Sequence, residues 1–466
     1  MVWTPSIQLL VSASLNRREE IRILQFSAKP SWRSLTLHFA ILLGGLCWLG
    51  ETVRVALVET WGESSQLKDL ERARALDPRN AEIYYRMGTL ELLGATSPSS
   101  APAWWFRHAT DLNPKIGRYW LGLGRACFVA QDQACADQAL ERATRLSPMT
   151  PSTEWEAATY EVFTGHFERS FSRLAGLLRQ DPDKEQEIFR FTWRAFDPEV
   201  TWQRILAGVP DNRVKCDYLV FLSQNGRFDL AKNYWMQMAA ASAPPSFAAA
   251  KAYLQQLLAT QRYVDAARVW SDLLHNGSLG QSGTADQDTL VFNGGFERPA
   301  LNAGFDWNLA QTAFVSVDFL DPSAQSGKHA LRIDYTVPHN VDTEPVYQLI
   351  PVLANQKYLL TAYSRSDELT SDSGPRLRVE DVECPACLDA SSEMTLGTTP
   401  WHELKLTFST GPKTEILRLS VWRARGRSFP MDISGSFWLD AVSLIPQQPS
   451  LSPQTGSRQI ANSQMP

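Results

Sequence analysis

Four prolines spaced at a nearly constant interval constrain the fold of this chain more than any other feature. They are Pro78, Pro114, Pro148 and Pro182, and the intervals between them are 36, 34 and 34 residues. Each follows Asp, Asn or Ser, and a polar residue before proline ends one helix and caps the next. A period near 34 residues predicts stacked helix pairs, because each pair can bury its apolar face only against its neighbours.

The clearest of these units begins at Gly117 and resembles the tetratricopeptide repeat family. Gly124 and Ala136 are small, which we expect where the two helices of a pair touch, and larger residues fill the gap to the next pair. The resemblance extends over residues 64–275 and implies an α-solenoid that binds a protein partner, with a plain spacer as the alternative. The matching positions are Trp120, Leu123, Gly124, Cys127, Ala136, Leu140, Ala143 and Pro148.

An uncharged apolar run near the N-terminus predicts a membrane anchor. The run covers residues 35–49, and weaker apolar character extends it to residues 35–58, where Glu51 and Arg54 have the spacing to pair on one helix face. Basic residues outnumber acidic ones in residues 1–34, which predicts a flexible cytoplasmic N-terminus and an exported remainder. The predicted segment is a single-pass transmembrane signal anchor in contact with lipid. A buried helix of a soluble protein is the alternative.

The pattern changes after the helical repeats. Residues 276–289 are rich in Gly, Ser, Asp and Gln, which predicts a linker. In residues 290–446 apolar residues alternate with polar ones, as at Leu331, Ile333 and Tyr335, which predicts an antiparallel β-sandwich. Residues 447–466 predict a disordered tail. The predicted fold class is therefore multidomain α + β: a transmembrane helix, a solenoid resembling tetratricopeptide repeats and a C-terminal β-sandwich.

Three motifs in the β region carry a second resemblance. Residues 292–297, 326–333 and 435–444 together resemble the jelly-roll carbohydrate-binding modules and their galactose-binding-like relatives. The resemblance implies polysaccharide binding. It also implies a structural calcium site with Glu297 and Asp440 as acidic ligands, in accordance with the preference of Ca²⁺ for several oxygens. Two carboxylates satisfied by hydrogen bonds are the alternative, and no other cofactor is expected.

Sugar binding would need exposed aromatic faces, and the β region offers several aromatic residues. Alternation along the strands places some of them in the core, so the sequence alone leaves the glycan-binding residues unassigned. The available residues are Trp307, Trp401, Trp422, Tyr335, Tyr347 and Tyr363.

The six cysteines suggest at most two disulfides. Cys127 and Cys135 flank the turn of one predicted helix pair, where they form either a disulfide or part of the core. Cys384 and Cys387 follow a predicted strand and no helix follows them at once, so we expect a local disulfide ahead of free thiols, a redox motif or a metal site. Cys47 and Cys216 are expected to be unpaired.

Charge and motifs exclude several functions. The net charge of −5 and the lack of a long basic run argue against nucleic-acid binding. No HExxH, GxSxG or phosphate-binding glycine motif is present, so we expect no catalytic residues and no enzyme. The alternatives are a polysaccharide lyase or hydrolase on the sandwich, and a pure protein scaffold without glycan binding. Candidate carboxylates for the enzyme are Asp334, Glu344, Glu380 and Glu383.

These features together predict a non-enzymatic scaffold of a bacterial cell envelope. We expect a single-pass protein of the inner membrane, with its helical repeats and sandwich in the periplasm or outside the cell. A role in envelope or exopolysaccharide assembly would use both predicted partners, a protein and a polysaccharide.

Overall fold

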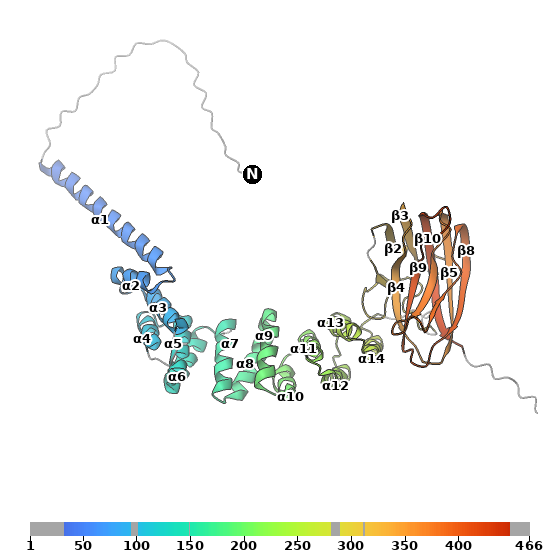
Figure 1. The fold of residues 1–466 in the computed structure, drawn as a ribbon. Coiled ribbons are helices and arrows are strands. Elements are labelled where there is room, and N and C mark those ends of the chain that lie inside the picture. The colour runs from blue at the N-terminus through green and yellow to red at the C-terminus, as the bar shows by residue number, and fades with distance from the viewer. Residues whose placement is uncertain (1–31, 95–100, 149, 281–288, 311–312, 448–466) are drawn as a thin grey trace, which may run out of the picture. The chain divides into compact units, whose positions relative to one another are not determined.

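The computed structural model describes residues 32–94, 101–148, 150–280, 289–310 and 313–447 (Figure 1). Most of the predicted flexible N-terminus, the centre of the predicted linker and nearly all of the predicted tail lie outside these ranges. The chain divides into two compact units, residues 1–157 and 158–466. The predicted fold class is confirmed: a helical part with one long apolar helix precedes two antiparallel sheets.

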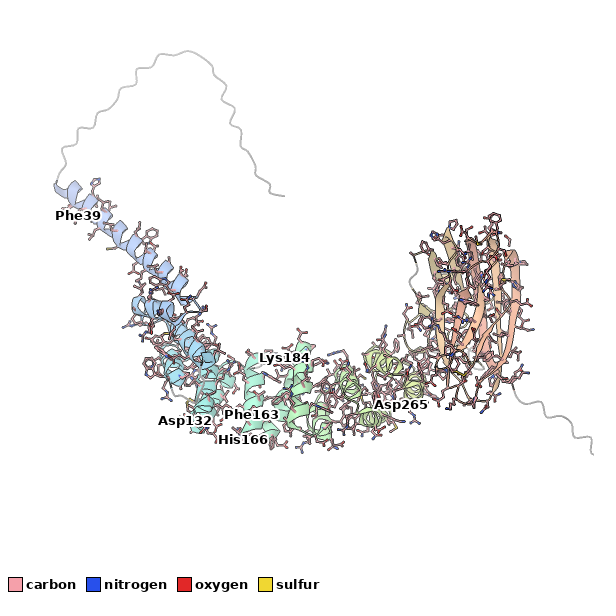
Figure 2. The ribbon with its side chains drawn as sticks, viewed as in Figure 1. Phe39, Asp132, Phe163, His166, Lys184 and Asp265 are labelled. Atoms are coloured by element: carbon pink, nitrogen blue, oxygen red, sulfur yellow. A yellow bond between two sulfur atoms is a disulfide. The ribbon has the colours of Figure 1, made fainter. Side chains whose placement is uncertain are left out.

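Helix α1, Trp32–Gly62, is the one helix among the described residues that is long and apolar enough to cross a membrane. The side chains of Phe39 and Trp48 are 68% and 71% exposed, and Phe39 projects freely from the helix in Figure 2. The expected pairing of Glu51 with Arg54 is confirmed, at 2.9 Å between Oε2 and Nε. Only the end of α1 joins a core, where Val58 packs with residues of the next two helices.

The first unit continues as antiparallel helix pairs. The phased prolines behave as predicted, because helices end two residues before Pro78, Pro114 and Pro148. Helices α5 and α6 touch closely at Gly124, where an added Cβ would lie 3.0 Å from Leu140 Cγ. The helices are α2 (Leu67–Leu76), α3 (Ala81–Gly94), α4 (Ala101–Leu112), α5 (Gly117–Val129) and α6 (Gln133–Leu146), with α7 (Pro151–Phe163) crossing the boundary between the units.

The helical part of the second unit is regular at its ends and irregular in its centre. Residues 183–211, which the sequence predicts only as helical, contain short 3₁₀ segments and a π-helical turn. The elements are α8 (Phe167–Gln180), η1 (Pro182–Lys184), α9 (Glu185–Ala195), α10 (Pro198–Val200), η2 (Thr201–Ile205), η3 (Leu206–Gly208), α11 (Asn212–Gln224), α12 (Phe228–Ala239), α13 (Phe247–Ala259) and α14 (Tyr263–His275).

Two five-stranded antiparallel sheets form the sandwich. The front sheet has the order β1-β4-β9-β6-β7, and the back sheet has the order β2-β3-β10-β5-β8. The predicted alternation is confirmed, since Leu331, Ile333 and Tyr335 all point into the shared core. The strands are β1 (Asn308–Leu309), β2 (Val315–Asp321), β3 (Ala330–His339), β4 (Thr343–Pro351), β5 (Lys357–Leu369), β6 (Arg376–Asp381), β7 (Asp389–Ser391), β8 (Gly397–Ser409), β9 (Ile416–Arg423) and β10 (Ile433–Pro446).

The first and last segments of the sandwich lie side by side. Leu290 N donates to Leu444 O at 2.9 Å, and Val442 N donates to Gly294 O at the same distance. A side chain at Gly294 would collide with the carbonyl oxygen of Val442, so the close approach requires glycine. This closure brings two of the sequence motifs together, although about 140 residues separate them.

Candidate functional site

The structure separates the aromatic residues that the sequence offers for sugar binding. Trp307 and Tyr335 lie in the core of the sandwich. Tyr347 on β4 and Trp422 on β9 are partly exposed, and their strand neighbours Val346 and Val421 point inward. Successive side chains on a strand point to opposite faces, so Tyr347 and Trp422 share the outer face of the front sheet. The remaining two, Trp401 and Tyr363, belong to strands β8 and β5 of the back sheet.

Charged residues surround these two rings on the outer face of the front sheet. Strand β6 places Arg376 opposite Trp422, and it places Glu380 opposite Arg418 of β9. Sequence reasoning did not single out the arginines, although they alternate with the buried Leu377 and Val379 that the β pattern identifies. We call this surface the polar face. It consists of Glu344, Tyr347, Arg376, Arg378, Glu380, Asp389, Arg418, Ser420 and Trp422.

One arginine at the centre of the polar face organises its carboxylates. Arg378 donates to both oxygens of Asp389 at 2.8 and 2.9 Å, and it lies 2.7 Å from Glu380 and 3.3 Å from Glu344. The second oxygen of Glu344 pairs with Arg418 at 2.9 Å. The hydrogen bond from Arg378 lowers the pKa of Asp389, whereas burial raises the pKa of Glu380 despite the nearby guanidinium. The network fixes several hydrogen-bonding groups on this face of the sheet.

The two aromatic rings of the polar face are held in place by guanidinium groups. The Arg418 guanidinium lies 4.0 Å from the centre of the Tyr347 ring, and that of Arg378 lies 4.6 Å from the Trp422 ring. Trp422 Nε1 also donates to Asp342 Oδ1 at 3.0 Å. Contacts of this kind stabilise the rings and restrict their rotation. The polar face therefore presents two partly exposed aromatic rings, each with a guanidinium over one side, next to fixed polar groups.

A buried arginine stabilises the loops at one end of the polar face. Arg423, the last residue of β9, is fully buried and makes no ion pair within the described part of the chain. Its guanidinium donates to oxygens from three loops, so it links the β3–β4, β5–β6 and β9–β10 connections. The acceptors are the Asn340 side chain, the Ser371 hydroxyl and the carbonyl oxygens of Val341, Ser373 and Met431.

The two carboxylates predicted to bind calcium approach the same turn. Asp440 Oδ2 accepts hydrogen bonds from the amides of Gln325 and Ser326 at 2.9 Å. Glu297 Oε1 accepts from the amides of Lys328 and His329 at 2.6 and 3.1 Å. Burial raises the pKa of Asp440, and the charge of Glu297 adds to this effect.

The surroundings of this carboxylate pair fit a hard cation. In the described structure no Lys or Arg pairs with Glu297 or Asp440, and the only ionisable contact is His329 Nδ1, 3.5 Å from Glu297. The five amide hydrogen bonds to the two carboxylates fit the hydrogen-bonded alternative, whereas the lack of a Lys or Arg partner leaves room for a cation. The described ranges hold no cluster of three or more His, Cys, Asp or Glu residues, so main-chain or water oxygens would complete a calcium shell. The calcium site stays a prediction.

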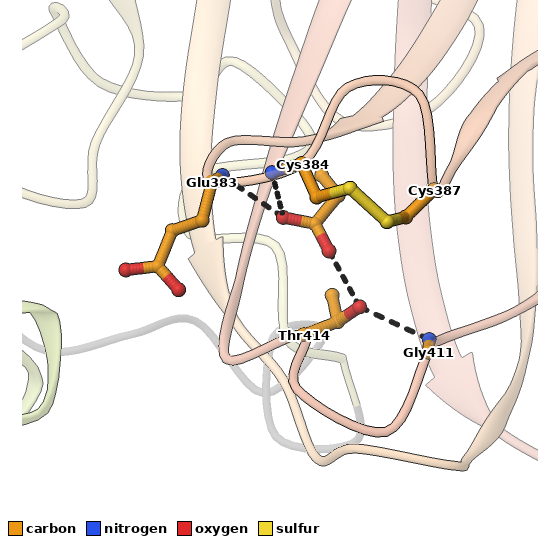
Figure 3. Close-up of a disulfide and its surroundings, with 6 residues drawn as sticks. Glu383, Cys384, Cys387, Gly411 and Thr414 are labelled. Carbon is orange, nitrogen blue, oxygen red and sulfur yellow. Dashed lines mark hydrogen bonds between the residues drawn. A yellow bond between two sulfur atoms is a disulfide. The ribbon is translucent and has the colours of Figure 1, made fainter.

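The structure joins both candidate cysteine pairs. Cys127 on α5 and Cys135 on α6 form a disulfide across the turn of one helix pair. Cys384 and Cys387 form a second disulfide within one loop (Figure 3). Asp381 supports that loop, because its carboxylate accepts hydrogen bonds from the amides of Glu383 and Cys384 and from the Thr414 hydroxyl.

The two remaining cysteines are unpaired, as expected. Cys47 lies exposed on α1, and Cys216 lies buried on α11. Burial raises the pKa of the Cys216 thiol to about 12, so this cysteine is unreactive near neutral pH.

The carboxylates considered for an enzyme are only partly brought together. Asp334 lies on β3 of the back sheet beside Arg332, and Glu383 lies in the disulfide loop. Glu344 and Glu380 do meet, because both contact the Arg378 guanidinium.

The helical part of the second unit contains a pocket of about 520 Å³ at its irregular centre. The indole of Trp202 stacks on Tyr234 with ring centres 4.3 Å apart, and its Nε1 donates to Gln237 at 2.9 Å. The lining is partly apolar and partly polar, and the segment η2 that carries Trp202 is π-helical, a feature frequent at functional sites. The lining residues are Trp202, Gln203, Leu206, Ala207, Pro210, Asn212, Lys215, Gln237, Met238, Ala241, Ser242 and Ala243.

Comparison with known proteins gives structural likeness alone. The sequence matches no protein-family model and no curated protein. A solved CBM4 domain is 16% identical and covers 34% of this chain and 99% of its own, with a TM-score of 0.25. A xylan-binding domain from CBM 22 is 13% identical over 34% of this chain and 96% of its own, with a TM-score of 0.26. The structure of MamA is 14% identical over 42% of this chain and 90% of its own, also with a TM-score of 0.26.

At these identities and TM-scores the likenesses carry no argument about function. The elements themselves define the class of protein: a multidomain α + β chain with an apolar N-terminal helix, paired helices and an antiparallel sandwich.

Proposed function

We propose that this protein is a membrane-anchored, non-enzymatic scaffold whose sandwich binds polysaccharide on the polar face. One observation carries the proposal: Tyr347 and Trp422 lie on the same outer face of neighbouring strands, with fixed charged groups between and beside them. The weakly positive C–H groups of a sugar ring stack on the negative face of an aromatic ring. The hydroxyl groups of the same sugar can bond to carboxylates and guanidinium groups of the network around Arg378.

The direct test removes one ring at a time. We expect Trp422→Ala and Tyr347→Ala, in the full chain in lipid nanodiscs, each to weaken binding to a panel of soluble bacterial polysaccharides about tenfold, which corresponds to about 1.4 kcal/mol. Trp401→Ala on the back sheet is the matched control and should bind like the wild type. Equal binding by Trp422→Ala and wild type would exclude the polar face as the site. If the wild type binds no member of the panel, the pure-scaffold alternative is favoured.

The proposed location rests on α1 and the two disulfides. The exposed apolar surface of α1 fits the interior of a bilayer, and residues before it carry the excess of basic groups expected on the cytoplasmic side. Disulfides persist in oxidising compartments, which supports a periplasmic or extracellular position for the helices and the sandwich. A bacterial inner-membrane protein in envelope or exopolysaccharide assembly fits these features.

The helical part is proposed to act as a tetratricopeptide-like array that binds a protein partner. The support is the helix-pair spacing and the pocket beside Trp202, which offers an apolar ring next to the polar side chains of Gln203 and Lys215. A structural calcium ion held by Glu297 and Asp440 is also part of the proposal. It would stabilise the turn that follows β2 and would take no part in chemistry.

A polysaccharide-cleaving enzyme is the second candidate, and one observation favours it. Glu344 and Glu380 lie on either side of Arg378, and the pKa of Glu380 is raised by burial, as for a general acid. Both carboxylates are paired with the same guanidinium, however, so neither is free to exchange protons with a ligand. We therefore expect no new reducing or unsaturated chain ends when polysaccharides that bind are incubated with the protein. Their appearance, and their loss in Glu380→Gln, would establish the enzyme.

A further inference from the structure

One arginine of the polar face differs from the other two in having no carboxylate partner. Arg378 pairs with three carboxylates, and Arg418 pairs with Glu344. Arg376 makes no ion pair with any described residue. Its Nη2 reaches the Ser373 hydroxyl at 3.0 Å and, more weakly, the Gly374 carbonyl and the Met394 sulfur at 3.5 Å.

The Arg376 guanidinium is also partly removed from water. Burial lowers its pKa, and its Nε atom is buried without a hydrogen-bond partner within the described structure. It lies 5.2 Å from the centre of the Trp422 ring. A partly desolvated cation with no counter-ion is electrostatically costly, and an anion that pairs with it recovers that cost.

The adjoining β9–β10 loop adds positive charge at this end of the face. Arg425 and Arg427 are exposed, and neither forms an ion pair with the residues that the structure describes. The loop is held in place, because Asp372 accepts hydrogen bonds from the amides of Arg427 and Ser428 at 3.0 and 2.7 Å. The carboxylate of Asp372 is thus engaged with the loop backbone, and that of Asp342 is engaged with the Trp422 indole.

We propose that the Arg376 end of the polar face binds the carboxylate of an acidic sugar, so that the polysaccharide recognised is a polyuronate. The inference rests on the proposed function and specifies its ligand. The sugar ring stacks on Trp422, and its carboxylate pairs with the Arg376 guanidinium, whose planar fork matches a carboxylate. Arg425 and Arg427 raise the local concentration of the acidic polymer.

The test compares two polymers that differ only in charge: a polyuronate and the same polymer after its carboxylates are reduced to alcohols. With the full chain in nanodiscs, we expect the wild type to bind the polyuronate at least about tenfold more tightly than the reduced polymer, as for a charge-assisted pair. Arg376→Gln should abolish that preference, so that the variant binds the polyuronate and the reduced polymer with equal affinity. Arg376→Lys should retain part of the preference, because it keeps the charge without the planar fork.

Controls separate this inference from general attraction between charges. Arg365→Gln, on β5 of the back sheet, removes the same charge elsewhere and should leave the preference intact. Equal losses in Arg376→Gln and Arg365→Gln would mean non-specific polyelectrolyte binding and overturn the inference. Equal wild-type affinity for both polymers, with both lost in Trp422→Ala, would overturn the acidic ligand and leave the polar face as the site. Failure to bind either polymer while a neutral glycan binds would also overturn it.

Discussion

At the scale of single residues, the turn between β2 and β3 shows how a carboxylate pair shapes the sandwich. The backbone of this turn comes so close to Glu297 that a side chain at Gly327 would collide with Oε1. Gly327 also has a φ of 71°, which only glycine adopts readily. Burial alone would raise the pKa of Glu297, but the amides of Lys328 and His329 outweigh it and lower the pKa. Glu297 is therefore charged at neutral pH, beside the fully buried Asp440.

This charge arrangement predicts that calcium stabilises the sandwich. We expect about 1 mM CaCl₂, the range of extracellular calcium modules, to raise the melting temperature of the full chain in nanodiscs by several degrees relative to EGTA. Tryptophan fluorescence is the measurement, because Trp307 is buried in the same domain. Glu297→Gln should fold and lose the calcium effect, whereas Glu383→Gln, in a different loop, should keep it. An identical melting temperature in calcium and EGTA would favour the hydrogen-bonded carboxylate alternative.

The same scale shows what the sequence reveals about the aromatic residues. Tyr335 continues the buried series of Leu331 and Ile333, so its place in the core follows from the pattern alone. Trp422 directly follows Val421, which the pattern places inside, and this already indicates the outer face. No such series surrounds Trp307, which lies outside the strands and is fixed in the core by a hydrogen bond from Nε1 to the Asn293 carbonyl. Contacts between segments that are far apart in the sequence place Trp307 in the core. The alternation of apolar and polar residues along a strand cannot predict such contacts.

At the scale of elements, α9 and α11 meet through a charged cluster. Glu185 at the start of α9 pairs with Arg213 of α11. Asp217, one helical turn after Arg213, also pairs with it, at 2.8 Å from Nη1. Burial and the neighbouring charge of Glu185 raise the pKa of Asp217 to about 6. The single guanidinium of Arg213 therefore does not fully neutralise the charges of Glu185 and Asp217.

This cluster predicts a pH dependence with a definite sign. Between about pH 4 and pH 6 the folded chain holds more protons on Asp217 than the unfolded chain, so stability from this group falls as pH rises. We expect Asp217→Asn to melt at a higher temperature than the wild type at pH 7.5 and at a similar temperature near pH 4, by circular dichroism of the helices. The exposed Asp183→Asn is the control. A lower melting temperature for Asp217→Asn at pH 7.5 would show that its pairing with Arg213 dominates instead.

The helical elements were predictable where a repeated local signal fixes them. A polar residue followed by proline predicts the end of each of α2, α4, α6 and α8, because a few neighbouring residues are enough to terminate a helix. The segment from η1 to η3 has no such signal. Its π-helical turn at residues 201–205 is stabilised by tertiary packing, with Ile205 and Leu206 fully buried. The pocket beside Trp202 arises from this irregular segment, so the sequence pattern could not predict it.

At the scale of the whole molecule, the apolar surface of α1 predicts stable insertion into a membrane. We expect the full chain to stay in the membrane pellet after alkaline carbonate extraction. The double variant Leu42→Arg/Leu46→Arg should appear in the soluble fraction, because each arginine near the centre of a span costs about 2.5–3.5 kcal/mol. Leu93→Arg, at an exposed leucine outside α1, is the control and should remain in the pellet. Extraction of the wild type would favour the soluble-helix alternative.

The orientation of α1 in the membrane determines on which side of it the sandwich lies. The disulfide between Cys384 and Cys387 needs an oxidising compartment, and an extracellular polysaccharide can reach Trp422 only on that side. Protease added to intact spheroplasts should therefore digest the sandwich and spare an epitope at the N-terminus, and lysis should expose that epitope. A sandwich that survives until lysis would lie in the cytoplasm, where glutathione keeps thiols reduced and secreted glycans are absent. That result would remove the proposed ligand while leaving the helix pairs and both sheets as described.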